Sequence, residues 1–312
     1  MISIPQLEYI VAIDTYRHFV TAADKCFVTQ PTLSMQIKKL EESLGVIIFD
    51  RTKQPIIPTD IGKKIIEQAR ITLAESKKIN EIIEEHNDIL SGNLTIGIIP
   101  SLAPYILPLF IGKLTEQYPL INITIVELLS EEIIERLKND TIDVGLLVTP
   151  LNESGIIEEA IFYEKMLLFA NKNHPLATKK HIETNEMTSE GLWLLGKGHC
   201  FRSQVVNLCT YQDEKVKDSK FNFESGSLET IKKIIETEGG YTLLPELAIN
   251  DCNPKNTIIR AFNSETLIRE VGIVYSRNHV KKRMLEVLSK SIAKAVPKDF
   301  LDSQRGQIVE WR

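Results

Sequence analysis

Residues 19–44 read FVTAADKCFVTQPTLSMQIKKLEESL, and this stretch decides the fold of the first part of the chain. It predicts one short helix that begins near Thr21 and a second helix that begins after Thr29, with only a few residues between them. Pro31 suits the first turn of the second helix, whose apolar residues then repeat at helical spacing until Gly45 stops it. Two short helices joined in this way are typical of a helix-turn-helix, although a three-helix core that binds no nucleic acid has the same periodicity.

Polar and basic side chains gather at the start of the second helix and in the segment that follows it. Glutamine bonds adenine through two hydrogen bonds, serine and threonine bond base edges or phosphate, and lysine neutralises phosphate. Residues 47–59 are expected to form a small two-stranded wing whose basic residues would reach the flanking DNA backbone or minor groove. The residues predicted to contact double-stranded DNA are Gln30, Pro31, Thr32, Ser34, Gln36, Lys38, Arg51 and Lys53.

A long polar helix without an interior proline is expected from Thr59 to about Leu90. Its apolar residues form a seam along one side: Ile61, Ile65, Ala69, Leu73, Ile79, Ile82 and Ile83. Such a helix either packs on its own domain or pairs with a copy of itself. Its length of roughly 30 residues favours the pairing.

From residue 91 onwards the pattern changes to alternating strands and helices, which is typical of an α/β fold. Short strands are expected at 94–99, 121–128, 144–148, 166–170, 192–195, 241–244 and 271–275, and amphipathic helices at 131–138 and 227–238. We therefore divide the chain into a winged helix-turn-helix (1–58), a linker helix (59–90) and a regulatory domain (91–312). The regulatory domain is long enough for two lobes, lobe I from about 91–163 with 267–300 and lobe II from about 164–266.

The overall composition is ordinary for a globular protein, with 312 residues, 43% apolar and 25% charged. No apolar run is long enough to span a membrane and no signal peptide is recognisable, so we expect a cytoplasmic protein without a membrane partner. The net charge of −5 argues weakly against nucleic acid, which means that the basic groups must act as a local cluster. In a reducing cytosol the four cysteines are not expected to form permanent structural disulfides.

Two of the cysteines, Cys200 and Cys209, lie in a segment with an unusual pattern. Glycines precede Cys200 and apolar residues follow it at helical spacing, which predicts a helix that begins at Cys200. The positive end of the helix dipole and the neighbouring His199, Arg202 and Lys197 would favour the thiolate, the species that attacks oxidants.

The spacing of the pair also has a geometric consequence. Nine residues of unbroken helix rise roughly 13 Å, whereas a disulfide needs Cα atoms within about 7 Å. The helix must therefore unwind before the two thiols bond, and a bridge that breaks native packing is expected to be reducible again. Two inert buried cysteines fit the spacing equally well, and a zinc site would need two more ligands. We expect no metal and no cofactor, and we interpret Cys26 and Cys252 as structural.

The sequence resembles the LysR-type transcriptional regulators over residues 19–63, from Phe19-Val-Thr-Ala-Ala-Asp through Thr29-Gln-Pro-Thr-Leu-Ser to Thr59-Asp-Ile-Gly-Lys. The resemblance implies a winged helix-turn-helix, a dimerising linker helix and a regulatory domain of two α/β lobes that is similar to periplasmic binding proteins. It also implies a homo-oligomer, a dimer of dimers on bent promoter DNA, that works with RNA polymerase.

The regulatory domain resembles the OxyR branch of that family, which senses hydrogen peroxide. The motifs are Gly198-His199-Cys200-x-Arg202 with Cys209, then residues 225–230 (SGSLET) and 239–245 (GGYTLLP). The resemblance implies that peroxide oxidises Cys200 to a sulfenic acid, that Cys209 resolves it to a disulfide, and that a thiol reductant resets the switch. His199 would orient peroxide and Arg202 is retained, as in the relatives.

Four positions depart from the pattern of those relatives. Ser101 and Ser130 stand where the relatives carry threonines that help to hold peroxide, and serine keeps the hydroxyl group. Ser203 stands where they carry an aspartate, and Ser276 is where we place their arginine near the last strand, with Arg277 beside it.

We expect a peroxide-responsive, DNA-binding regulator of oxidative-stress genes, not an enzyme. One alternative is a LysR-type regulator that responds to a small metabolite between the lobes and carries inert cysteines. The other is a thiol peroxidase, which would turn peroxide over catalytically.

Overall fold

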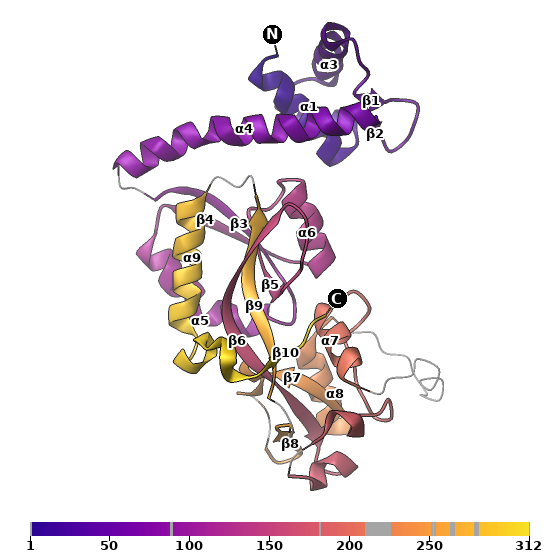
Figure 1. The fold of residues 1–312 in the computed structure, drawn as a ribbon, viewed down its shortest axis with the longest axis vertical. Coiled ribbons are helices and arrows are strands. Elements are labelled where there is room, and N and C mark those ends of the chain that lie inside the picture. The colour runs from indigo at the N-terminus through magenta and orange to yellow at the C-terminus, as the bar shows by residue number, and fades with distance from the viewer. Residues whose placement is uncertain are drawn as a thin grey trace. The chain divides into compact units, whose positions relative to one another are not determined.

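The computed structural model describes residues 2–87, 90–180, 182–209, 226–250, 252, 254–262, 266–277 and 281–311. The chain forms two compact units, one made of residues 1–89 with 278–281 and the other of residues 90–277 with 282–312. Figure 1 labels the elements of both units. No helix in the described ranges is both long and apolar enough to cross a membrane.

The first unit is a winged helix-turn-helix, as the sequence predicts. Its elements are α1 (Ile4–Tyr16), α2 (Phe19–Lys25), α3 (Gln30–Leu44), the antiparallel wing strands β1 (Phe49–Asp50) and β2 (Ile57–Pro58), and α4 (Asp60–Asn87). Helix α2 begins two residues earlier than expected, because His18 caps it by accepting the Thr21 backbone N–H. The core of the first unit includes Ile10, Ile13, Leu33 and Ile37, which are completely buried.

Helix α4 fits both interpretations of its apolar seam along different parts of its length. Ile66 and Ala69 are buried in the core of the unit, and Arg70 forms an ion pair with Asp14 of α1 at 3.0 Å. Ile79 and Ile82, further along, are more than 60% exposed. The first part of α4 therefore packs on its own unit, while the second part leaves apolar side chains available to a partner helix. The helix ends at Asn87, close to the predicted end, and Leu90 is not helical; residues 88–89 and the side chain of Ile83 lie outside what the structure describes.

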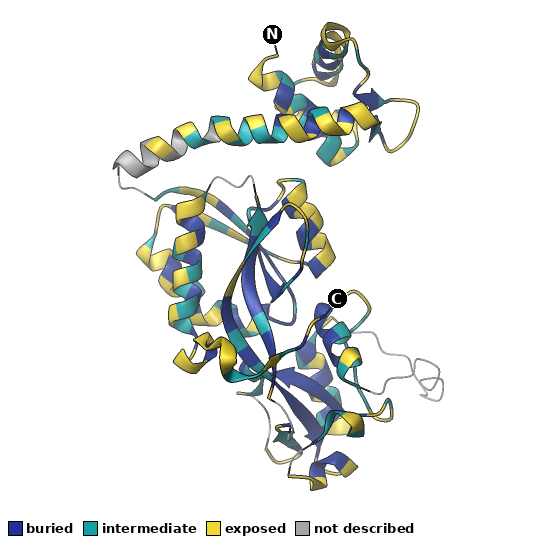
Figure 2. Cartoon of the chain, viewed as in Figure 1, coloured by how far each residue is buried: buried dark blue, intermediate teal, exposed yellow. Residues whose placement is uncertain are grey.

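The second unit is built on a twisted mixed sheet with the strand order β4-β3-β5-β9-β6-β7. Strands β3 (Gly92–Ile98), β4 (Ile121–Glu127) and β5 (Val144–Thr149) are mutually parallel, and β5 pairs antiparallel with β9 (Leu267–Ser276). The long strand β6 (Ile156–Asn171) pairs first with β9 and then with β7 (Tyr241–Pro245) and β8 (Thr257–Arg260). Strand β10 (Gln307–Ile308) joins β9 in parallel. The strands of the sheet are mostly buried (Figure 2).

Helices surround the sheet, and two hydrophobic clusters define the lobes. The helices are α5 (Ala103–Gln117), α6 (Ser130–Lys138), α7 (Cys200–Leu208), α8 (Leu228–Glu238) and α9 (Lys282–Ala295), with shorter 3-10 turns at Pro175–Thr178, Thr184–Glu186, Glu246–Ile249 (η4), Lys298–Leu301 and Ser303–Arg305. Side chains of β3, β5, α5, α6 and α9 form the first cluster, around which we define lobe I. Side chains of α7, α8, β7 and the second half of β6 form the second cluster, which defines lobe II.

The structure confirms most of the expected strands and corrects two of them. The expected strand at 192–195 is wrong: this segment makes only isolated bridges, at Leu192 (with Tyr241) and at Leu195. The expected strand at 166–170 is the end of β6, which begins ten residues earlier and runs through both lobes. We missed that first half because Glu158 and Glu159 interrupt its apolar pattern.

Candidate functional site

Cys200 is the first residue of α7, as predicted, and the turn before it explains its position. His199 caps the helix in an extended backbone conformation, and Gly198 has a φ of +91°. A Cβ atom at Gly198 would lie 3.0 Å from the Leu129 Cδ1 atom, so glycine suits both the left-handed conformation and the close approach. The thiol therefore sits at the positive end of the helix and is 2% exposed.

Burial and neighbouring groups act on the Cys200 thiol in opposite directions. Burial is the larger influence and raises the pKa of Cys200, because the thiolate loses its hydration. The Ser130 hydroxyl, the Arg269 guanidinium and the backbone N–H groups of Phe201 and Cys200 lower that pKa. The reduced site thus holds a neutral thiol next to groups that stabilise negative charge.

Arg269 is the central cation of this site. It is completely buried on β9, and its Nε and Nη2 atoms lie 2.8 and 2.7 Å from Oε1 of Glu164, which is also completely buried. Nη1 donates to the Ser101 hydroxyl at 3.3 Å and Nη2 to the Ser101 carbonyl at 3.2 Å. The guanidinium carbon lies 5.4 Å from the centre of the Phe201 ring. The arginine is thus held in place by the start of lobe I, by β6 and by α7.

Neither Ser276 nor Arg277, the positions named near the last strand from the sequence, supplies the cation that acts on Cys200. Arg277 is exposed at the end of β9, whereas Arg269 near the start of the same strand acts on the Cys200 thiol. A signal was present in the sequence: Arg269 and Glu270 interrupt the apolar pattern near the start of the strand, and a buried arginine requires a partner such as Glu164.

The two predicted serines lie in the interior with Cys200. Ser101 is 2% exposed and is tied to Arg269 through both its hydroxyl and its carbonyl. Ser130 is the first residue of α6 and is 1% exposed. Its hydroxyl lowers the pKa of Cys200, yet it makes no hydrogen bond of standard geometry within the described part of the chain. Ser130 therefore has hydrogen-bonding capacity to spare.

The other residues predicted around Cys200 play different parts. Lys197 is exposed, and Arg202 donates to the Leu195 carbonyl at 3.0 Å. The side chains that favour the thiolate are thus Ser130 and Arg269, not Lys197, Arg202 and His199 as we expected. Burial lowers the pKa of His199, so its imidazole is neutral at neutral pH. Ser203 is half-buried on α7, one turn after His199.

Cys209 lies at the opposite end of the same helix. It caps α7, packs against the cluster of lobe II, and burial raises the pKa of its thiol to about 12. Cys200 belongs instead to the cluster of lobe I. All four cysteines are free thiols, and an intact helix separates Cys200 from Cys209, as the spacing predicted.

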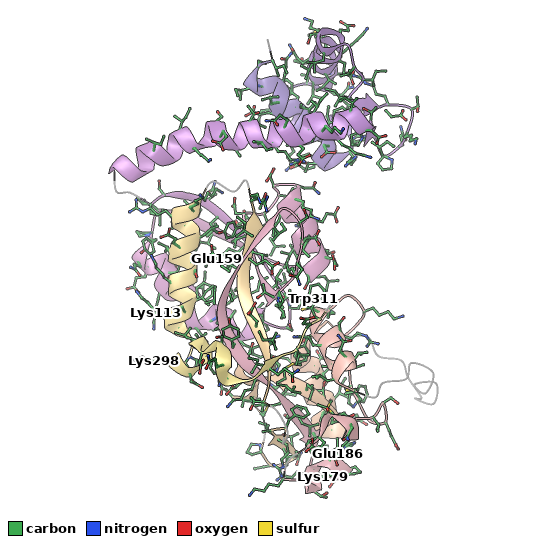
Figure 3. All side chains as sticks on the ribbon, in the orientation of Figure 1. Lys113, Glu159, Lys179, Glu186, Lys298 and Trp311 are labelled. Atoms are coloured by element: carbon green, nitrogen blue, oxygen red, sulfur yellow. The ribbon has the colours of Figure 1, made fainter. Side chains whose placement is uncertain are left out.

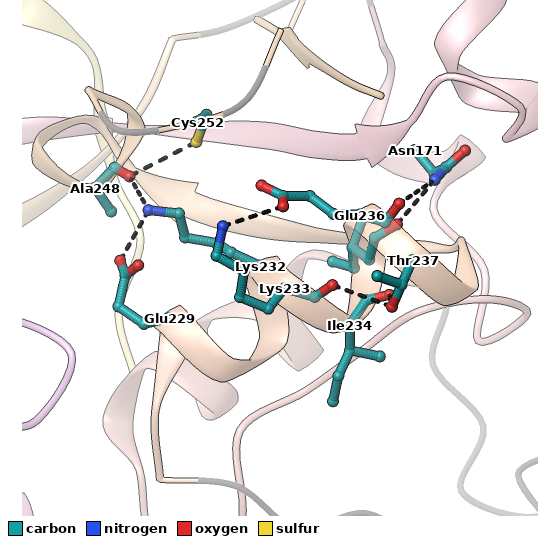
Figure 4. A network of polar contacts seen from close by, with 10 residues as sticks. Asn171, Glu229, Lys232, Lys233, Ile234, Glu236, Thr237, Ala248 and Cys252 are labelled. Atoms are coloured by element: carbon teal, nitrogen blue, oxygen red, sulfur yellow. Dashed lines mark hydrogen bonds and ion pairs between the residues drawn. The ribbon is translucent and has the colours of Figure 1, made fainter. Parts of the chain in front are cut away.

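The remaining cysteines are in structural surroundings. Cys26 packs against the core of the helix-turn-helix, where burial raises its pKa. The Cys252 thiol lies 3.8 Å from the Ala248 carbonyl, which also accepts the buried ammonium of Lys232 at 3.0 Å (Figure 4). Lys232 is paired with Glu229 at 2.8 Å. Within the described residues, no group of three or more His, Cys, Asp or Glu side chains is arranged to hold a metal ion.

The predicted DNA-contacting residues lie on α3 and in the wing segment between β1 and β2. Gln30, Pro31, Thr32, Lys38 and Lys53 are exposed, and Ser34 and Gln36 are half-buried. Thr29 caps α3 and shares a hydrogen bond of 2.8 Å with the Thr32 hydroxyl. Arg51 is held by Glu41 at 2.8 Å and by the Ser34 hydroxyl at 3.4 Å, which fixes the wing against α3.

Comparison with known families agrees with this architecture. Residues 4–63 match the family described as bacterial regulatory helix-turn-helix protein, lysR family, and residues 87–296 match the LysR substrate binding domain. The chain belongs to the LysR family of transcriptional regulators. Within the LysR family it falls in the OxyR branch, as the relatives show.

Three LysR-family relatives are similar over nearly the whole chain. The hydrogen peroxide-inducible genes activator of Haemophilus influenzae is 33% identical over 301 residues, 96% of this chain and 99% of the relative. The structure of a full-length OxyR variant from Pseudomonas aeruginosa superposes with a TM-score of 0.78 at 30% identity, covering 95% of this chain and 99% of that one. A Corynebacterium glutamicum OxyR mutant with hydrogen peroxide bound has a TM-score of 0.60 at 29% identity, covering 94% of this chain and 92% of that one.

Proposed function

We propose that the protein is a hydrogen-peroxide-sensing transcriptional regulator that binds promoter DNA and is switched by a reversible Cys200–Cys209 disulfide. The observation that carries the proposal is the placement of the two thiols. Cys200 is buried between Ser130 and Arg269 at one end of α7, and Cys209 lies at the other end of the same helix.

The first chemical step is attack of the Cys200 sulfur on one oxygen of hydrogen peroxide. The S–O bond forms as the O–O bond breaks, and the thiol proton leaves with the departing oxygen as water. Arg269 and Ser130 stabilise negative charge on the sulfur, and the spare hydrogen-bonding capacity of Ser130 is available to peroxide. We assign Ser101 and the neutral His199 to orienting peroxide.

The second step joins the two ends of α7. The Cys209 sulfur attacks the Cys200 sulfenic acid, the S–O bond breaks, and a second water is released as the disulfide forms. Because nine helical residues hold the thiols roughly 13 Å apart along the helix axis, α7 unwinds in this step. The conformational change follows from the chemistry itself. A cellular thiol reductant would reverse it. Arg202 and Ser203 lie on the segment that unwinds. We assign to Ser203 the role of the aspartate that the relatives carry at this position.

We further propose how the change reaches DNA. The exposed Ile79 and Ile82 of α4 are suited to pair with a second copy, and two such dimers would place four helix-turn-helix units on one promoter. Gln30, Thr32, Lys38 and their neighbours would contact the DNA in the cytoplasm, where the regulator meets RNA polymerase. The role of the protein is regulatory, with peroxide consumed once for each switch.

The proposal is tested by treating the reduced protein with one equivalent of hydrogen peroxide and mapping its thiols by mass spectrometry. We expect a rapid Cys200–Cys209 bridge that a dithiol reverses. A Cys209→Ser variant is expected to stop at the sulfenic acid, which a dimedone probe would trap on Cys200. Cys252→Ser is the matched control and is expected to form the bridge normally.

Other results would point to the alternatives. Unmodified Cys200 and Cys209 would contradict the proposal and favour a regulator that responds to a metabolite. Multiple turnovers of peroxide with a thiol reductant, without any effect on promoter binding, would favour a thiol peroxidase.

A further inference from the structure

The last described residues of the chain, Gln307–Trp311, form a strap that runs along β9. Gln307 N–H donates to the Thr266 carbonyl at 2.8 Å, and Val309 N–H donates to the Ile268 carbonyl at 2.9 Å. The strap is anchored in both lobes, because Val309 is buried in the cluster of lobe II and Trp311 in that of lobe I (Figure 3).

The strap is also bonded to α7, the helix between the two cysteines. Gln204 is completely buried, and its Nε2 atom donates to the Val309 carbonyl at 2.6 Å. Asn207 donates to the Glu310 carbonyl at 3.3 Å. Residues three apart lie on the same face of a helix, so these two amides form one row of contacts along the strap.

The strap therefore lies between α7 and β9, next to the buried arginine. Ile308 is in register with Ile268, the residue before Arg269. A close approach to β9 requires Gly306, because a Cβ atom there would lie 2.1 Å from the Thr266 carbonyl oxygen. The strap thus contacts the helix that carries Cys200 and the strand that carries Arg269.

We infer that Gln204 and the strap form a latch, in which Gln204 is a positioning residue that ties the helical state of α7 to the docked state of residues 307–311. The regulatory part of this inference rests on the proposed disulfide switch. When α7 unwinds, the hydrogen bond from the Gln204 amide to the Val309 carbonyl breaks. Because the docked strap then lacks this hydrogen bond, the strap and α7 open together.

The latch is poised to open. The Gln204 Oε1 atom is buried and has no hydrogen-bond partner within the described residues. A buried amide with one half unsatisfied carries a desolvation cost that unwinding relieves. The hydrogen bonds of Nε2 and Asn207 hold the helix against that cost.

The coupling is tested first in the reduced protein, by hydrogen–deuterium exchange with mass spectrometry. Gln204→Met keeps the volume and removes both the donor and the acceptor of the side-chain amide. We expect exchange of the Val309 amide and of the α7 amides to rise together by about 30-fold, as for the loss of a buried hydrogen bond to the backbone. Helix α8 of the same lobe is the internal reference and is expected to be unchanged. The control variant is Gln117→Met, which removes an exposed amide at the end of α5.

A second variant tests the latch from the other side. Removal of residues 306–312 is expected to raise α7 exchange by a similar factor while α8 stays protected. Two results would overturn the inference. One is a Gln204→Met variant in which α7 exchanges faster while exchange of the strap is unchanged, and the other is an increase in α8 exchange equal to that of α7.

The redox part is read in the same experiment after peroxide. Loss of strap protection in parallel with the Cys200–Cys209 disulfide is the expected result. A disulfide that forms while the strap stays protected would refute the latch and leave the proposed sensor intact. If no disulfide forms, the proposed function fails, and the exchange of the reduced variants still decides the latch.

Discussion

The buried ion pair between Arg269 and Glu164 makes a quantitative prediction about stability. Both side chains are completely inaccessible to solvent, so removing one partner leaves an uncompensated charge in the interior. Such a change costs about 3–5 kcal/mol. We therefore expect Arg269→Met to lower the free energy of unfolding by about that amount.

Glu164→Leu is expected to cost about as much as Arg269→Met, because each change also removes a hydrogen bond from a further buried group, which for Arg269→Met is Ser101. The second carboxylate oxygen of Glu164 accepts the Leu247 backbone N–H at 3.0 Å, and this buried donor would also lose its partner. A buried group left without its hydrogen bond adds about 1–3 kcal/mol. The double variant removes both charges, and hydrophobic replacements of a buried pair are well tolerated. It is expected to be more stable than the sum of the single effects predicts, by at least about 2 kcal/mol.

Urea unfolding followed by tryptophan fluorescence measures this cycle. Both tryptophans of the chain, Trp193 and Trp311, lie in the second unit and therefore report on it alone. The matched control is the pair of Lys290 and Glu286 on α9, whose side chains are 70% and 66% exposed at 3.4 Å. Its coupling energy is expected to be about 0.3–0.5 kcal/mol. Single variants of the buried pair that lose less than about 1 kcal/mol, or purely additive effects, would refute the reasoning.

Three further predictions concern other parts of the molecule. Because burial raises the pKa of Cys200, its thiolate forms only at alkaline pH. The rate of Cys200 oxidation by peroxide, measured by stopped flow, should therefore still be rising above about pH 9, where a free thiol titrates. A rate that reaches its plateau already at pH 7 would contradict this. Gly62→Ala should destabilise the first unit by about 1–3 kcal/mol in thermal unfolding, because the new Cβ would lie 2.1 Å from the Ile48 carbonyl oxygen. Gly112→Ala, in the interior of α5 with open space around it, should instead stabilise the second unit by about 0.5–1 kcal/mol. Equal effects of the two variants would argue against this packing. Ile79→Glu should weaken self-association at least tenfold in sedimentation equilibrium if α4 pairs with a copy of itself, and an unchanged constant would exclude this part of the helix from the interface.

The parts of the fold that depend on local signals were predictable from the sequence. Thr29, Pro31 and Gly45 mark the ends of α3 correctly, because capping is a matter of a few neighbouring residues. The start of α7 at Cys200 follows in the same way from Gly198 and the helical spacing after it.

The parts that depend on distant residues were not predictable. Arg269 meets Glu164 across 105 positions of sequence, and Ser130 reaches Cys200 from a distant helix, α6, so no local pattern brings them together. The same limit explains our error about what favours the thiolate. Lys197 and Arg202 are neighbours of Cys200 along the chain, but one is exposed and the other is occupied by the Leu195 carbonyl. The strap was missed because its partners on α7 bond backbone carbonyls, which every residue carries.

The packing of α7 has an electrochemical consequence. Phe201 and Val205 lie between the two cysteines and are each 1% exposed in the core of lobe II. If the bridge unwinds α7, it exposes them, at about 1.5–3 kcal/mol for each side chain. For a two-electron couple, 1.4 kcal/mol corresponds to about 30 mV. Exposure of both raises the midpoint potential of the pair by roughly 60–130 mV above that of a bridge that disturbs no packing. The hydrophobic residues between the cysteines therefore set the ambient potential at which the dithiol becomes a disulfide, and a substitution such as Val205→Ala, which makes that packing weaker, would lower this potential without touching either sulfur.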